Sequence, residues 1–141
     1  MTTEEFKHDY QHSLSIRVAW SDMDALAHVN NSNYFTYMES ARIDFLEGYE
    51  HLMPMPREGM GPILAYVDCQ FIAPLTYPDQ VLVGSRIIGI GNTSVQIEQA
   101  LYSTTMGKIV ATSKSVMVVI DYSTGEKVRV PDSVRQMFDK R

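Results

Sequence analysis

Polar residues crowd into the stretch from Trp20 to Tyr34. Two carboxylates, an imidazole and three amides fall within twelve residues: Asp22, Asp24, His28, Asn30, Asn31 and Asn33. Carboxylates and imidazoles are side chains that enzymes use to move protons or to attack a carbonyl group. Such a density of reactive groups is unusual for a simple connection, so this stretch is the candidate functional site.

A helix is predicted directly after this stretch, because apolar residues recur there at three- and four-residue steps: Tyr34, Phe35, Met38, Ala41, Phe45 and Leu46. It should run from about Asn33 to Gly48, with a cap at Asn31, Ser32 or Asn33.

The start of this helix could take part in the chemistry. The first backbone N–H groups of a helix have no partner inside it, and they carry the positive end of its dipole. Aimed at a carbonyl oxygen, they would stabilise negative charge developing there. With Asp24 on the other side of that carbonyl, as a general base or a nucleophile, the arrangement would suit acyl transfer.

The size and charge of the chain limit what it can be. Its 141 residues fit one domain, since single domains commonly run to roughly 100 to 200 residues. The formal net charge of -5 and the lack of a lysine or arginine cluster argue against nucleic acid or an anionic membrane as partner. Cys69 cannot form a disulfide within the chain, and its apolar neighbours predict a buried, inert thiol. The N-terminus lacks the features of a secretory signal and no apolar run approaches a membrane span, so a cytoplasmic protein is expected.

The rest of the chain predicts mostly strands. Residues 1–11 are expected to be a frayed end, and residues 49–62 hold the prolines and glycines typical of an irregular surface segment. Runs of apolar residues predict five strands and then a short helix, over 13–20, 63–72, 80–90, 94–102, 108–121 and 131–138.

These elements predict an α+β fold. Short turns between most of the strands imply a largely antiparallel sheet. The helix would be about 24 Å long and the longer strands about 26 to 34 Å, so the helix could lie along the sheet and be wrapped by it. One helix cannot cover a sheet and close both of its edges, so association of subunits through an edge strand is expected.

A resemblance to a known family rests on the same residues. The segments Val18-Ala-Trp-Ser-Asp-Met-Asp24 and His28-Val-Asn-Asn31, followed by Tyr34 and by Glu39-Ser-Ala-Arg42, resemble the signature of hotdog-fold acyl-CoA thioesterases of the 4-hydroxybenzoyl-CoA thioesterase type. The resemblance continues through the segment from Tyr66 to Asp79 and covers about the whole chain. It implies a hotdog fold.

The resemblance also implies roles for individual residues. The second acidic residue of the Asp-x-Asp pair is catalytic in that family, which corresponds to Asp24, and the backbone N–H that polarises the thioester carbonyl lies close to Asn31. Another branch uses a glutamate of the central helix, for which Glu39 is the matching position. Ala27 stands where the family has glycine, and alanine would be strained there if the site needs a positive φ.

Several site residues have more than one interpretation. An aspartate in a loop before a helix commonly forms a cap or a turn. His28 could orient the loop, contact substrate or assist proton transfer, and Glu39 could simply pair with Arg42. Tyr34, Phe35 and Met38 could line an acyl tunnel, although such a stripe more commonly packs in the core. The acidic residues and His28 have no second group of ligands at convincing spacing, so no metal is expected.

The sequence and the resemblance together predict an acyl-CoA thioesterase that releases free acid and CoA, without a cofactor because water is the second substrate. Its active site is expected between the subunits of a dimer or tetramer. Two alternatives stay open. The first is an acyl-thioester hydratase or dehydratase on the same fold, and the second is a non-catalytic module that binds acyl-CoA.

Overall fold

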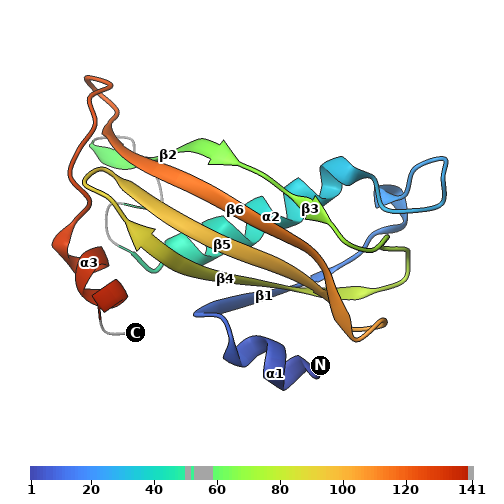
Figure 1. Cartoon of the computed structure of the whole chain (residues 1–141). Helices are drawn as coiled ribbons and strands as arrows, with labels where there is room; N and C mark the ends of the chain where they lie inside the picture. Colours follow the sequence, from blue (N-terminus) through green and yellow to red (C-terminus); the bar gives the residue numbers. More distant parts are fainter. Residues whose placement is uncertain (50–51, 53–58, 140–141) are drawn as a thin grey trace.

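The computed structural model describes residues 1–49, 52 and 59–139. Helix α2 (Asn31–Leu46) lies against one face of a curled antiparallel sheet (Figure 1). The strands are β1 (His12–Arg17), β2 (Met60–Val67), β3 (Gln70–Phe71), β4 (Gln80–Ile90), β5 (Ser94–Ser103) and β6 (Lys108–Asp121). They pair in the order β1-β4-β5-β6-β2. The short β3 pairs with β6 on the same edge as β2, farther along that strand. The five strands of the path β1-β4-β5-β6-β2 curl around the long helix, which confirms the predicted α+β architecture.

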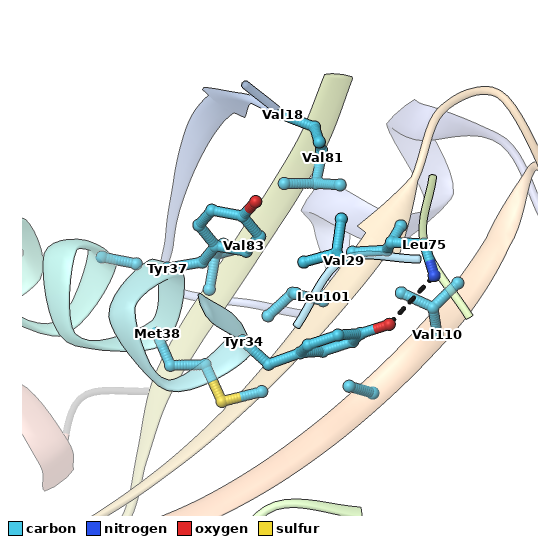
Figure 2. Packing of buried hydrophobic residues seen from close by; sticks show 12 residues of the cluster. Val18, Val29, Tyr34, Tyr37, Met38, Leu75, Val81, Val83, Leu101 and Val110 are labelled. Carbon is cyan, nitrogen blue, oxygen red and sulfur yellow. Dashed lines mark hydrogen bonds between the residues drawn. The ribbon is translucent and has the colours of Figure 1, made fainter. Parts of the chain in front are cut away.

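The two halves of α2 pack into separate apolar clusters. Figure 2 shows the first, the N-terminal cluster, which comprises Val18, Val29, Tyr34, Tyr37, Met38, Ala41, Leu75, Val81, Val83, Leu101, Val110 and Ala111. The second, the C-terminal cluster, comprises Phe45, Leu46, Leu52, Ile87, Val95, Ile97, Met117, Val119, Val130 and Val134. Helix α3 (Asp132–Asp139) contributes Val134 to the second cluster, which confirms the predicted terminal helix.

A polar band separates the two clusters. Each central strand has a buried polar residue at a position that faces inward, in line with the apolar residues of the same strand. These residues are Ser85 on β4, Gln99 on β5, and Ser113 and Ser115 on β6. Gln99 Nε2 donates hydrogen bonds of 2.9 Å to Met38 O and to Ser85 Oγ. From α2, Arg42, which is only 4% exposed, donates from Nη1 to Gln99 Oε1 over 3.3 Å.

The prediction that residues 1–11 form a frayed end is wrong. Helix α1 (Thr3–His8) is capped by Thr2, whose Oγ1 accepts a hydrogen bond of 3.1 Å from the Glu5 N–H. Phe6 is fully buried against the outer face of the sheet, where it packs with Leu82, Ala100 and Tyr102. The signal missed in the sequence is the threonine followed three residues later by glutamate, a pattern typical of a helix start.

The strand predicted over residues 13–20 ends earlier than expected. β1 stops at Arg17, and Trp20 opens a short 3-10 turn in which it is 74% exposed rather than facing the core. The reason is Asp22, whose Oδ2 accepts the Ala19 N–H over 2.9 Å and so folds the chain back. α2 also begins at Asn31 rather than Asn33, because Asn30 and none of the three proposed residues is its cap.

The strand predicted over residues 63–72 is two strands, β2 and β3. Asp68 interrupts the pairing, and its Oδ1 accepts the Lys114 N–H over 2.8 Å in place of a backbone partner. β2 starts at Met60, within the segment 49–62 that was expected to be irregular, and most of that segment lies outside the described residues. Cys69 is partly buried, and burial raises the pKa of its thiol to about 11. Among the described residues, no helix has the length and apolar character that a membrane span requires.

Candidate active site

The start of α2 is shaped by Asn30. Its Oδ1 accepts hydrogen bonds from the Ser32 N–H, over 2.9 Å, and from Ser32 Oγ, and its carbonyl oxygen accepts the Asn33 N–H. These bonds occupy the N–H groups of the second and third residues of the helix. Among the residues that the structure describes, none accepts a hydrogen bond from the Asn31 N–H. The first helical residue therefore keeps a free backbone donor.

The loop before α2 is a tight turn built on Asp24. The Asp24 N–H donates to His28 O over 2.9 Å, and the Ala27 N–H donates back to Asp24 O over 3.0 Å. Ala27 adopts a φ of 63°, the left-handed conformation in which glycine is unstrained. Asp24 Oδ1 accepts the Leu26 N–H over 2.9 Å, so the aspartate is a turn former, as the simpler interpretation held. Its second oxygen, Oδ2, has no hydrogen-bond partner among the described residues.

Asp24 and the helix start line one pocket of about 420 Å³. One wall is the loop and the first turn of α2, including Asp24, His28, Asn30, Asn31 and Tyr34. The other wall is the end of β3 and the segment after it, with Phe71, Ile72, Ala73 and Pro74. The structure thus brings together an aspartate oxygen and a free helix N–H, beside an apolar surface that could accept an acyl group.

The other predicted site residues are distributed differently. His28 lines the pocket and is exposed. Glu39, Phe35 and Met38 are not among the described residues that line it. Glu39 is exposed farther along α2, Met38 is fully buried in the N-terminal cluster, and Phe35 lies at the surface with its ring 6.3 Å from that of Phe71.

Tyr34 uses its hydroxyl to join the two walls of the pocket. The hydroxyl accepts the Leu75 N–H over 2.9 Å, the contact drawn as a dashed line in Figure 2. It also donates to Ala73 O over 3.2 Å. Because Val29 N–H donates to Leu75 O over 2.9 Å, the wall after β3 is held to both the loop and the helix.

A second tyrosine, Tyr37, was missed by the sequence analysis. It is buried, and its hydroxyl donates to Asp22 Oδ2 over 2.6 Å. Burial and this bond to Asp22 raise the pKa of Tyr37, so the phenol remains protonated near neutral pH. The sequence did show a phenol three residues after Tyr34 on a helix that starts beside two carboxylates, but nothing in it indicated which carboxylate the phenol would reach.

Glu39 and Arg42 have separate surroundings. The guanidinium of Arg42 lies in the polar band, and burial lowers its pKa while the charge of Glu39 raises it. No salt bridge within 4.0 Å joins them among the described residues. Arg42 is therefore directed at Gln99 rather than at the surface of the helix.

An α+β domain of this topology with an aspartate loop at the start of its central helix defines the hotdog class of thioester-processing proteins. The chain belongs to the thioesterase-like superfamily, whose model matches residues 18–138.

Individual relatives agree with this assignment. The long-chain acyl-CoA thioesterase FadM of Escherichia coli is 22% identical over 125 residues, which span 89% of this chain and 95% of FadM. A thioesterase from Thermus thermophilus, solved with coenzyme A and zinc, superposes with a TM-score of 0.76 at 25% identity, over 90% of this chain and 96% of that one. A thioesterase-superfamily protein from Jannaschia has the same fold, with a TM-score of 0.86 at 21% identity over 98% of this chain and 90% of its own.

Proposed function

We propose that the protein hydrolyses acyl-CoA thioesters to free acid and CoA, with Asp24 as the catalytic carboxylate and the Asn31 N–H as donor to the thioester oxygen. The observation that carries this proposal is that Asp24 and Asn31 line the same pocket, and that a carboxylate oxygen of the first and the N–H of the second have no partner among residues 1–49, 52 and 59–139. Membership of a thioesterase superfamily supports it, as do the acyl-CoA substrate in the name of FadM and the coenzyme A bound to the Thermus protein.

The reaction can follow two routes. As a general base, Asp24 Oδ2 takes a proton from water while the water oxygen attacks the carbonyl carbon; the C–S bond of the tetrahedral intermediate then breaks, and the CoA thiolate leaves and takes up that proton. As a nucleophile, the same oxygen attacks first, the CoA thiolate leaves, and water then hydrolyses the resulting anhydride. In both routes the negative charge on the thioester oxygen is stabilised by the Asn31 N–H and the positive end of the α2 dipole.

Other residues of the pocket have supporting roles in this proposal. His28, at the exposed side of the pocket, contacts the substrate or assists proton transfer. Tyr34 forms part of the acyl surface together with Phe71. Phe35 and Met38 reach the acyl group only if it extends beyond the pocket along α2, and Glu39 is the second candidate for the catalytic carboxylate.

A second copy of the chain is the expected partner that completes the site. β2 is an edge strand of the sheet, and it exposes Ile63, Leu64 and Tyr66. Phe71 and Ile72 of the pocket wall are also exposed, so the apolar surface continues from the edge strand to the pocket. An unpaired, apolar edge is a ready surface for another subunit. We therefore expect Leu64→Lys to lower both the mass in analytical ultracentrifugation and the turnover, while Met106→Lys, on the exposed turn between β5 and β6, changes neither.

The test of the activity is to offer a panel of acyl-CoAs to the purified protein and to follow free thiol. Replacing Asp24 by Asn should lower kcat by about 10² to 10⁴-fold, the usual cost of losing a positioned acid or base. Asp9→Asn, at an exposed aspartate of the α1 end, is the matched control and should keep full activity. Binding of a non-hydrolysable thioether analogue should persist in both variants.

The remaining outcomes distinguish the alternatives. If the wild type binds the analogue but releases no thiol from any acyl-CoA, the protein is a binding module. If it hydrates an enoyl-CoA without releasing thiol, it is a hydratase. Full turnover in Asp24→Asn together with loss in Glu39→Gln would move the catalytic role to Glu39.

A further inference from the structure

Asp22, the first carboxylate of the Asp-x-Asp pair, lies at the centre of the hydrogen bonds that connect the loop to α2. Its Oδ2 accepts from the Tyr37 hydroxyl over 2.6 Å and from the Ala19 N–H over 2.9 Å. Its backbone oxygen accepts from the Asn30 N–H and from Asn33 Nδ2, each over 2.9 Å. One residue therefore binds the turn before the loop, the helix cap and two successive turns of the helix.

These contacts determine which backbone donors are left for a substrate. The Asn30 N–H is used by Asp22 O, and the Ser32 N–H is used by the Asn30 side chain. The Asn31 N–H, which lies between them in the chain, has no acceptor among the described residues. Moving Asp22 would release Asn30 and so disturb the cap that presents the Asn31 N–H to the pocket.

The same contacts hold Asp24. Asp24 follows Asp22 by two residues. Met23, between them, forms a β-bridge with Val29, and the Asp24 N–H donates to His28 O. The position of Asp24 relative to α2 therefore depends on where Asp22 is attached to the helix. Tyr37 makes that attachment from a buried position, with a phenol that donates to the carboxylate.

We propose that Asp22 and Tyr37 are a pair of positioning residues, which hold the Asp24 carboxylate and the Asn31 N–H at the separation that the reaction requires. This inference rests on the proposed function for its kinetic consequences, but not for its structural ones. Asp22 does not touch the substrate, since its Oδ2 is occupied by Tyr37 and Ala19 and it is not among the described residues of the pocket.

The two aspartates should respond differently to the same substitution. In Asp22→Asn the amide oxygen can still accept both hydrogen bonds, so we expect kcat within about threefold of the wild type, whereas a lost acid or base in Asp24→Asn costs about 10² to 10⁴-fold. Asp22→Ala removes the acceptor, and kcat should fall by about 10 to 10²-fold with little change in KM, since small misplacements of reacting groups have such effects.

Tyr37→Phe tests the other partner, because it keeps the ring in the core and removes the hydroxyl. Its kcat should fall toward that of Asp22→Ala, which also loses the bond to the Ala19 N–H. The double variant should lose no more than Asp22→Ala alone, because both substitutions remove the Tyr37–Asp22 contact. The matched control is Tyr102→Phe, another buried tyrosine whose hydroxyl makes one bond, of 2.8 Å, to Met1 O far from the pocket. It should lower Tm comparably and leave kcat unchanged.

A readout without substrate separates this inference from the proposed function. Hydrogen exchange at the amides of Asp24, Ala27 and Asn30 should accelerate in Tyr37→Phe and Asp22→Ala but not in Asp22→Asn or Tyr102→Phe. If exchange at these amides is unchanged, or if Tyr37→Phe loses no more kcat than Tyr102→Phe, the positioning role is wrong. If the wild type has no thioesterase activity but the exchange pattern holds, the structural role stands and the proposed function fails.

Discussion

The two halves of α2 do different work although they belong to one helix. The first half begins at the pocket and carries Tyr34, whose hydroxyl bonds to the segment after β3, and Tyr37, whose hydroxyl bonds to Asp22 in the loop before the helix. The second half carries Phe45 and Leu46, which are buried in the C-terminal cluster, and the Phe45 ring also lies 5.5 Å from that of His12. The comparison shows that hydrogen bonds of defined direction set the geometry of the candidate site. At the C-terminal half of the helix, stability depends instead on how completely apolar side chains fill the core.

The largest expected effect is on stability, at the C-terminal cluster. Ile97 is fully buried there, and Ile97→Ala should lower the free energy of unfolding by about 2 to 5 kcal/mol through lost burial and the cavity left behind. Turnover per folded molecule, measured well below Tm, should stay at the wild-type value. A large fall in kcat would show that the two halves are coupled more tightly than their separate packing implies.

An intermediate effect is expected at the pocket end. Tyr34→Phe keeps the ring but leaves the buried Leu75 N–H without an acceptor, which should lower the free energy of unfolding by about 1 to 3 kcal/mol. Unlike Ile97→Ala, it should also reduce kcat on acyl-CoA, because one wall of the pocket loses its attachment. Denaturant unfolding and steady-state kinetics on the same preparation would check both, and unchanged kinetics would contradict the attachment role.

In the polar band between the two clusters, replacing two different serines by alanine should change the free energy of unfolding in opposite directions. Ser85 Oγ accepts a hydrogen bond from Gln99, so Ser85→Ala should lower the free energy of unfolding by about 1 kcal/mol. In the part of the chain that the structure describes, Ser113 Oγ is buried without a partner, so Ser113→Ala should raise it by about 1 kcal/mol. Equal losses in the two variants would mean that Ser113 has a partner.

The smallest effect is expected in the loop itself, at Ala27. Its φ of 63° costs an L-residue about 1 to 2 kcal/mol, and glycine avoids that cost but gives up about 0.5 to 1 kcal/mol in chain entropy. Ala27→Gly should therefore raise the free energy of unfolding by about 0.5 kcal/mol and leave kcat nearly unchanged. A clear loss of stability in thermal unfolding would show that the alanine methyl makes a contact that outweighs its strain.

Much of the fold could be predicted from the sequence because its signals are local. Apolar periodicity located α2 to within two residues, and runs of apolar residues located β4, β5 and β6 almost to their ends. The errors arose where a side chain replaces a backbone partner. Asp22 ends β1 by bonding to Ala19, and Asp68 divides the strand predicted over residues 63–72 by bonding to Lys114, and neither contact has a periodic signature.

The residues of the candidate site could be predicted from the sequence, but the hydrogen bonds that join them could not. The density of polar residues and the resemblance identified Asp24, His28 and Asn31, which the structure places in one pocket. The tertiary contacts of Tyr34 and Tyr37 could not be read from spacing, because each depends on a residue brought near by the fold: Leu75 for one and Asp22 for the other. Phe35 and Met38 were chosen for their place in the apolar stripe of the helix and Glu39 for its match to the family, but of α2 only Asn31 and Tyr34 are among the described residues that line the pocket.

Helix α1 has a consequence for larger assemblies. It covers part of the convex side of the sheet, with Phe6 on Leu82 and with Tyr10 so close to Gly84 that a methyl group there would lie 2.6 Å from the ring. The strands beneath this segment are therefore covered, and a partner could contact them only if the segment moved away. Any partner that docks on this face of the sheet would meet α1 rather than the bare strands.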